Sequence, residues 1–243
     1  MKPVLQVKNL VKRFGALTAT NDISFDLHAG ESLALIGPNG AGKTTIFSQI
    51  MGELRQSEGS IHLYGEEISH LKPAARIKRQ VSRTYQVPRP FAELTVLENI
   101  RIGHMPNSIW SMLTQQPDLD YERELANKVG LVEADHQRTP AELSMGDLRK
   151  LEMARTMATD PKVMLLDEVF AGLTTAEVAQ ISDLILQMRA DGMTFLVVSH
   201  DLPALKPLVD TAIAINQGQE IARGSFDQVL ADPAVLSSYL GEV

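Results

Sequence analysis

The chain has 243 residues, of which 44% are hydrophobic and 22% charged, as in a globular protein with a substantial core. Its 30 acidic and 23 basic residues give a formal net charge of -7, which argues against nucleic acid as a main partner. Zero cysteines exclude disulfides and thiolate metal sites, and no apolar run approaches the roughly 20 residues that cross a bilayer. We therefore expect any membrane role to come through another chain.

Short strand signals dominate the first third of the chain and predict strands over 4–7, 23–27 and 32–36. The first of them lies in an N-terminal segment that lacks the continuous apolar stretch of a signal peptide. The third contains four successive apolar residues, Leu33 to Ile36, and is predicted to be buried on both faces in the centre of a parallel sheet. A glycine-rich loop and a helix follow it.

The sequence changes character between about 86 and 159, where strand signals disappear. Helical spacing of apolar residues predicts helices over 94–101, 121–129 and 147–158. Residues 105–120 contain Pro, Asn and Asp and are predicted to form an irregular, mobile connection.

The last third of the chain has a strand–helix–strand rhythm. Buried strands are predicted over 163–166 and 195–198, with a helix over 176–190 between them, and this order implies parallel strands. A hairpin over 212–222 and two short helices over 226–240 are predicted to close the chain.

The loop after the third strand matches the phosphate-binding pattern G-x-x-x-x-G-K-[ST] and lies between a strand and a helix. It reads Gly37, Pro38, Asn39, Gly40, Ala41, Gly42, Lys43 and Thr44, with Thr45 next. Backbone amides and the helix N-terminus would bind the phosphates of ATP, Lys43 would reach the β- and γ-phosphates, and Thr44 would bind Mg²⁺. The alternative is an accidental glycine turn, expected in roughly one chain in a hundred of this length.

Two carboxylates, Asp167 and Glu168, end the buried strand 163–166. Burying them is costly unless a cation lies nearby. In a P-loop protein Asp167 would support Mg²⁺, and Glu168 would act as the general base on the attacking water. The alternative is a strand that simply reaches solvent. His200 follows another strand and lies at the same predicted edge of the sheet.

In this order, the motifs resemble those of the ATP-binding cassette (ABC) ATPase family. The series is Gly37 to Thr44, Gln86, Leu143-Ser144-Met145-Gly146-Asp147, Val163 to Glu168, and His200. The resemblance spans nearly the whole chain and implies an α/β P-loop NTPase fold: a RecA-like core with an antiparallel β subdomain, from residues 1–85 and 160–243, and an α-helical subdomain from residues 86–159.

The resemblance also implies roles for individual residues. In a head-to-tail dimer, Ser144 and Gly146 would cap the γ-phosphate that the partner copy binds. Phe14 would stack on adenine, although a plain surface residue is the alternative. Gln86 would touch Mg²⁺ and water, and His200 would contact the γ-phosphate. Glu168, His200 and Gln86 are thus the expected catalytic residues, and Thr44, Gln86 and Asp167 the expected metal ligands.

Four residues depart from the broad family pattern: Met145, Asp147, Val169 and Thr174. Backbone amides at 145 and 146 remain available, so we still expect the phosphate to be capped. Several departures are shared by the branched-chain amino-acid uptake branch, which the chain resembles at Arg83 to Gln86, Arg89 to Phe91, Leu94 to Asn99, Asp167 to Leu173 and Tyr239 to Gly241.

The resemblance predicts the ATP-hydrolysing subunit of a transporter that takes up a small solute. The expected partners are a second ATPase copy or paralogue, transmembrane permease subunits and a solute-binding protein, at the cytoplasmic face of the membrane. The alternatives are an exporter or lipid-moving complex with the same ATPase, and a soluble cassette protein of DNA repair or translation. A P-loop kinase is a further alternative, but it would not need residues 143–147.

Overall fold

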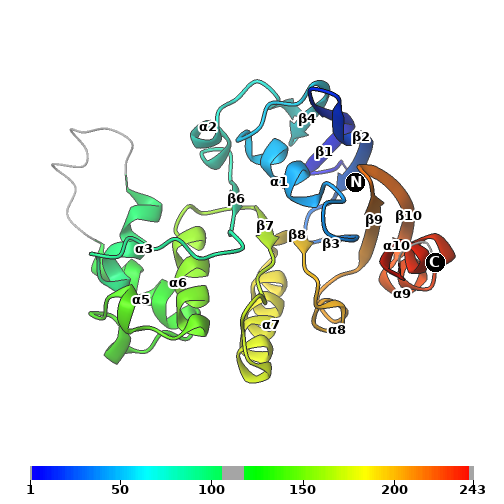
Figure 1. The fold of residues 1–243 in the computed structure, drawn as a ribbon. Coiled ribbons are helices and arrows are strands. Elements are labelled where there is room, and N and C mark those ends of the chain that lie inside the picture. The colour runs from blue at the N-terminus through cyan, green and yellow to red at the C-terminus, as the bar shows by residue number, and fades with distance from the viewer. Residues whose placement is uncertain (1, 106–117, 241–243) are drawn as a thin grey trace.

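The computed structural model describes residues 2–105 and 118–240, which form two sheets and several groups of helices (Figure 1). The antiparallel sheet contains, in spatial order, β2 (Leu17–Leu27), β1 (Leu5–Phe14), β4 (Glu58–Leu63) and β5 (Glu66–Glu67). The second sheet contains β10 (Gln219–Ser225), β9 (Thr211–Asn216), β3 (Ser32–Ile36), β8 (Thr194–Val198), β7 (Val163–Asp167) and β6 (Val81–Arg83). Its strands are parallel except for β10, which confirms the α/β class.

The helices fall into separate groups around these sheets. Those next to the sheets are α1 (Lys43–Met51), α2 (Pro73–Ile77), α7 (Thr175–Ala190), α8 (Leu202–Leu205), α9 (Phe226–Leu230) and α10 (Pro233–Leu240). Three others, α3 (Val96–His104), α5 (Leu119–Lys128) and α6 (Met145–Met157), lie together on one side of the molecule, away from the antiparallel sheet (Figure 1). None of the helices in the described ranges has both the length and the apolar character needed to span a bilayer.

The central strands β3, β7 and β8 are buried along their whole length, as their apolar runs predict. Alternate residues face opposite sides of the sheet. Ala34 and Met164 belong to the cluster that includes α7, whereas Leu35 and Leu165 belong to the cluster that includes α1 and the antiparallel sheet. Each fully buried aliphatic side chain contributes roughly 1.5–3 kcal/mol, so the sheet holds both sides of the molecule together.

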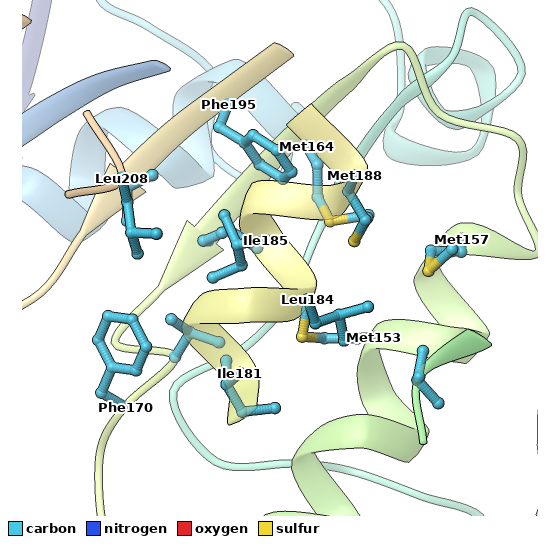
Figure 2. Close-up of a cluster of buried hydrophobic side chains, with 14 of the residues drawn as sticks. Met153, Met157, Met164, Phe170, Ile181, Leu184, Ile185, Met188, Phe195 and Leu208 are labelled. Carbon is cyan, nitrogen blue, oxygen red and sulfur yellow. The ribbon is translucent and has the colours of Figure 1, made fainter. Parts of the chain in front are cut away.

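Helix α7 lies between the parallel sheet and α6, and methionines fill much of this contact (Figure 2). Met153 and Met157 of α6 face Leu184 and Met188 of α7, and Phe195 of β8 packs on the other side of α7. Methionine is unbranched and polarisable and repacks easily. The contact between α6 and α7 is therefore formed to a large extent by flexible side chains.

The structure corrects several predicted boundaries. β1 and β2 are longer than their apolar patterns, and β4 and β5 carried no recognised signal. The sequence also predicts a strand over 81–85, just before Gln86, whereas β6 ends at Arg83, because side chains of α6 bind both the N–H and the carbonyl oxygen of Tyr85. Residues 106–117 of the predicted irregular connection lie outside the described part of the chain, and α5 begins at Leu119, capped by Asp118. The C-terminal hairpin and the two short helices after it are confirmed.

Candidate functional site

The glycine-rich loop 37–42 joins β3 to α1, and its backbone packs closely against β9 and β2. Gly37 has φ 147°, and a Cβ there would lie 2.0 Å from the carbonyl oxygen of Ile215. Gly42 caps α1 with φ 108°, and a Cβ there would lie 2.5 Å from the carbonyl oxygen of Ala19. Only glycine fits these positions, so the loop forms a cradle of backbone amides at a helix N-terminus, which is suited to phosphate.

Gly37→Ala is expected to lower the free energy of unfolding by about 2 kcal/mol more than Gly40→Ala does. Both glycines have positive φ, but a Cβ at Gly40 would meet nothing within 4 Å, whereas one at Gly37 would collide with backbone. Urea denaturation of the two variants measures the difference. Equal losses would contradict the prediction, because they would mean that a small loop movement relieves the collision.

Lys43, the first residue of α1, folds back over the loop. Its Nζ donates hydrogen bonds to the carbonyl oxygens of Gly37, at 2.7 Å, and Pro38, at 2.9 Å. Burial lowers the pKa of Lys43, and the carboxylates of Glu168 and Asp167 oppose that shift. A buried ammonium whose hydrogen-bond acceptors are neutral carbonyls favours an anion beside it.

The two acidic residues at the end of β7 point into different surroundings. Asp167 is buried, and its Oδ2 accepts a hydrogen bond from Nη2 of Arg83 at 2.5 Å. Glu168 has φ 50°, an uncommon value for a non-glycine residue, and its carboxylate turns toward the end of β8. There Oε2 accepts from the backbone N–H of His200 at 3.1 Å, and Oε1 lies 3.2 Å from Nε2 of the same residue.

A cavity of about 340 Å³ brings most of the predicted site residues together. Those that line it are Phe14, Asn39, Gly40, Ala41, Gly42, Lys43, Thr44, Thr45, Gln86, Glu168 and His200, joined by Leu17 and Ala19, which the sequence did not single out. Phe14 is 46% exposed at its rim. A larger cavity of about 580 Å³ beside β1, β2 and β9 holds none of the predicted residues. The smaller cavity is therefore the candidate nucleotide site, because it holds the residues that can bind phosphate.

Five predicted residues do not line this cavity: Gly37, Pro38, Ser144, Gly146 and Asp167. Ser144 caps α6, since its Oγ accepts from the backbone N–H of Asp147 at 3.1 Å and donates to the Asp147 carboxylate at 2.9 Å. The N–H of Gly146 donates to Oε1 of Glu177 at 3.1 Å. Thr174 caps α7 and holds Glu177 in place, so the unusual residues Asp147 and Thr174 both have local structural roles.

Gln86 has an exposed side chain and a tightly held backbone. Its carbonyl oxygen accepts from Nη2 of Arg149 at 2.8 Å, and the carbonyl oxygen of Tyr85 accepts from Nη1 at 2.6 Å. Oε1 of Glu152 accepts from the N–H of Tyr85 at 2.7 Å. Burial raises the pKa of Glu152, and the Arg149 guanidinium opposes this rise. The Arg149–Glu152 ion pair on α6 was not predicted from the sequence. Opposite charges three residues apart on a buried helix face are the signal that could have revealed it.

Comparisons with known proteins agree with this geometry. Residues 20–171 match the family described as ABC transporter. The high-affinity branched-chain amino acid transport ATP-binding proteins LivG of Escherichia coli and BraF of Pseudomonas aeruginosa are each 35% identical, over 99% of both chains. The lipopolysaccharide export system ATP-binding protein LptB of Haemophilus influenzae is 34% identical, over 98% of both chains.

A solved structure supports the same assignment. The ADP conformation of MJ1267, an ATP-binding cassette of an ABC transporter, is similar with a TM-score of 0.89 and 30% identity, over 100% of both chains. The family match covers more than half of this chain, and the relatives align over almost all of it. With its phosphate-binding loop and paired acidic residues, the chain belongs to the ABC transporter family.

Proposed function

We propose that this chain is the Mg²⁺-dependent ATPase of an ABC importer and energises uptake of a branched-chain amino acid or a similar small solute. The observation that carries the proposal is the cavity in which the loop around Lys43 faces Glu168 and His200, at the carboxyl ends of β3, β7 and β8. LivG and BraF support the uptake branch. LptB, an export system protein of similar identity, supports the alternative that the chain serves an exporter.

Thr44 and Gln86, which line the cavity, and Asp167, whose carboxylate interacts with Lys43, fit Mg²⁺ by the chemistry of their donor atoms. Thr44 offers a hydroxyl, Gln86 an amide oxygen and Asp167 a carboxylate oxygen, and hard oxygen ligands are those that Mg²⁺ prefers. When bound, Mg²⁺ would neutralise charge on the phosphate oxygens. The carboxylate of Asp167 already has one oxygen engaged by Arg83, which leaves the other for the metal side.

In the proposed reaction, Lys43 exchanges its two carbonyl partners for phosphate oxygens, which are stronger acceptors for an ammonium group. Glu168, whose carboxylate is held by the backbone N–H of His200, accepts the proton of the attacking water. The water oxygen bonds to the γ-phosphorus while the bond from that phosphorus to the β–γ bridging oxygen breaks, which releases ADP and phosphate. The His200 ring contacts the γ-phosphate. Phe14 stacks on adenine at the rim.

Ser144 and Gly146 belong to a different surface from the cavity of their own chain, so we assign them to the ATP held by a second copy or a paralogue. A separate groove of about 300 Å³, lined by Tyr85, Phe91, Ile102 and other residues, lies between β6 and α6. We assign this groove to permease subunits, which would hold the chain at the cytoplasmic face of the membrane. A solute-binding protein would complete an uptake system.

Uptake of labelled leucine by cells of the source organism tests the proposal. Cells that lack this chain should lose ATP-dependent uptake, and the parent chain should restore it, whereas Glu168→Gln should not. Restoration of uptake by Glu168→Gln would overturn the assignment of the ATPase. Unchanged leucine uptake together with a defect in lipid export would favour the alternative that LptB represents.

A further inference from the structure

Arg83 is a buried arginine beside the proposed magnesium ligand, and the reaction described above does not use it. It ends β6, next to β7 in the parallel sheet, and its side chain is 4% exposed. Nη2 donates to Oδ2 of Asp167 at 2.5 Å. Burying a guanidinium is costly unless it is paired. Nη1 and Nη2 of Arg83 are both hydrogen-bonded, whereas its buried Nε has no partner in the described part of the chain.

The other end of the guanidinium is fixed at the end of α1. Nη1 donates to Oε2 of Glu53 at 2.8 Å and to Oγ of Ser48 at 3.1 Å. Tyr85 donates its hydroxyl hydrogen to the second oxygen of Glu53 at 2.7 Å. The guanidinium carbon lies 5.1 Å from the centre of the Tyr85 ring and 5.6 Å from that of Phe47. Arg83 is thus held in its plane by hydrogen bonds and across it by aromatic rings.

This arrangement gives the Asp167 carboxylate a defined orientation. The planar guanidinium of Arg83 directs Nη2 to Asp167 and Nη1 to Glu53, two fixed directions that a lysine ammonium, which acts as a point charge, does not provide. With Oδ2 taken by Arg83, Oδ1 is the oxygen left to face a metal ion. Glu53 balances the charge of Arg83, so Asp167 keeps a partner without a surplus positive charge that would repel Mg²⁺.

We propose that Arg83 is a positioning residue for Mg²⁺ binding: it orients Asp167, and Glu53 and Tyr85 hold Arg83 in place. The inference rests on the proposed function, because it assumes that Asp167 faces Mg²⁺. Without Arg83, the carboxylate of Asp167 would lose the hydrogen bond that fixes Oδ2, and it would be free to rotate. Rotation of Asp167 would turn Oδ1 away from the metal ion and weaken Mg²⁺ binding, and the loop around Lys43 would stay intact.

The test measures the binding of AMP-PNP, a non-hydrolysable ATP analogue, to the whole chain by calorimetry at a series of Mg²⁺ concentrations. Arg83→Gln should raise the Mg²⁺ concentration for half-maximal binding by about tenfold, and Arg83→Lys, which keeps the charge but loses the fork, by about threefold. Binding without Mg²⁺ should stay at the parental level in both variants.

Arg76→Gln is the matched control. Arg76 is also a buried arginine beside the end of α1, and it donates at 2.7 Å to the carbonyl oxygens of Gln49 and Ile50, with no contact to Asp167. Its loss should lower stability without shifting the Mg²⁺ dependence. Arg83→Gln with a shift below about threefold, or a shift like that of the control, would overturn the proposal. If Arg83→Gln does not fold, an unshifted Arg83→Lys overturns it. A parent chain whose AMP-PNP binding does not depend on Mg²⁺ would instead refute the proposed function.

Discussion

Replacing Glu168 with glutamine is expected to lower the rate of ATP hydrolysis by at least about a hundredfold while ATP still binds. Glutamine has the shape of glutamate but accepts no proton from water. Its amide oxygen can keep the hydrogen bond from the backbone N–H of His200, so the loop after β7 should retain its geometry. ATP should therefore hold two copies together without being consumed, and the variant should accumulate as a closed dimer.

Steady-state phosphate release and size-exclusion chromatography with ATP and Mg²⁺ measure both effects. Glu31→Gln is the matched control, because Glu31 also accepts from the backbone N–H of a histidine, His28, at 2.9 Å, and lies 3.2 Å from its ring nitrogen. It lines the larger cavity, away from the phosphate loop. The control should keep the parental rate. Hydrolysis by Glu168→Gln near that rate, or a variant that stays monomeric with ATP, would contradict the role given to Glu168.

The residues that the sequence revealed are those that lie close together in the chain. The phosphate loop, the buried strands and the acid pair after β7 each have a local pattern, and the structure brings the loop, Glu168 and His200 to one cavity. Asp167 illustrates the limit. Its nearest cation, Arg83, is 84 positions away in the chain, and only the parallel pairing of β6 with β7 brings the two together.

The same reason explains the missed contacts of the helical segment. Glu177 accepts from the N–H of Gly146, 31 positions away, and Arg149 reaches the backbone of Gln86, 63 positions away. No periodicity connects such pairs. Of the departures from the family pattern, Thr174 caps α7, and Asp147 lies in the first turn of α6, where its carboxylate accepts a hydrogen bond from the capping residue Ser144. Met145 is 45% exposed, and no contact explains it.

Arg149→Met is expected to destabilise the fold by about 3–5 kcal/mol, whereas Arg149→Met combined with Glu152→Gln should recover most of that loss. Arg149 is fully buried and Glu152 is 3% exposed, and the two form an ion pair at 2.5 Å. Removing the arginine alone leaves the buried carboxylate of Glu152 without its cation. The double variant removes both charges and so leaves no unpaired carboxylate. Urea denaturation of the two single variants and the double variant measures the coupling.

A second buried ion pair is the control that separates an effect on stability from an effect on ATP hydrolysis. Arg101 and Glu122 form another ion pair in the same helical group, at 2.6 Å, with Glu122 fully buried and no hydrogen bond to the backbone of Gln86. Arg101→Met with Glu122→Gln should therefore leave ATP hydrolysis near the parental rate. The double variant of Arg149 and Glu152 should hydrolyse ATP more slowly even where its stability has recovered.

The reason for that difference is the position of α6. This helix begins next to Ser144, which we assign to the ATP of the second copy, and its side chains grip the backbone of Gln86, which we assign to the chain's own ATP. Residues fixed to one rigid helix move together, so the Arg149–Glu152 pair would couple closure at one ATP site to closure at the other. Parental ATPase rate and parental cooperativity in ATP, measured in the stable double variant, would rule out this link.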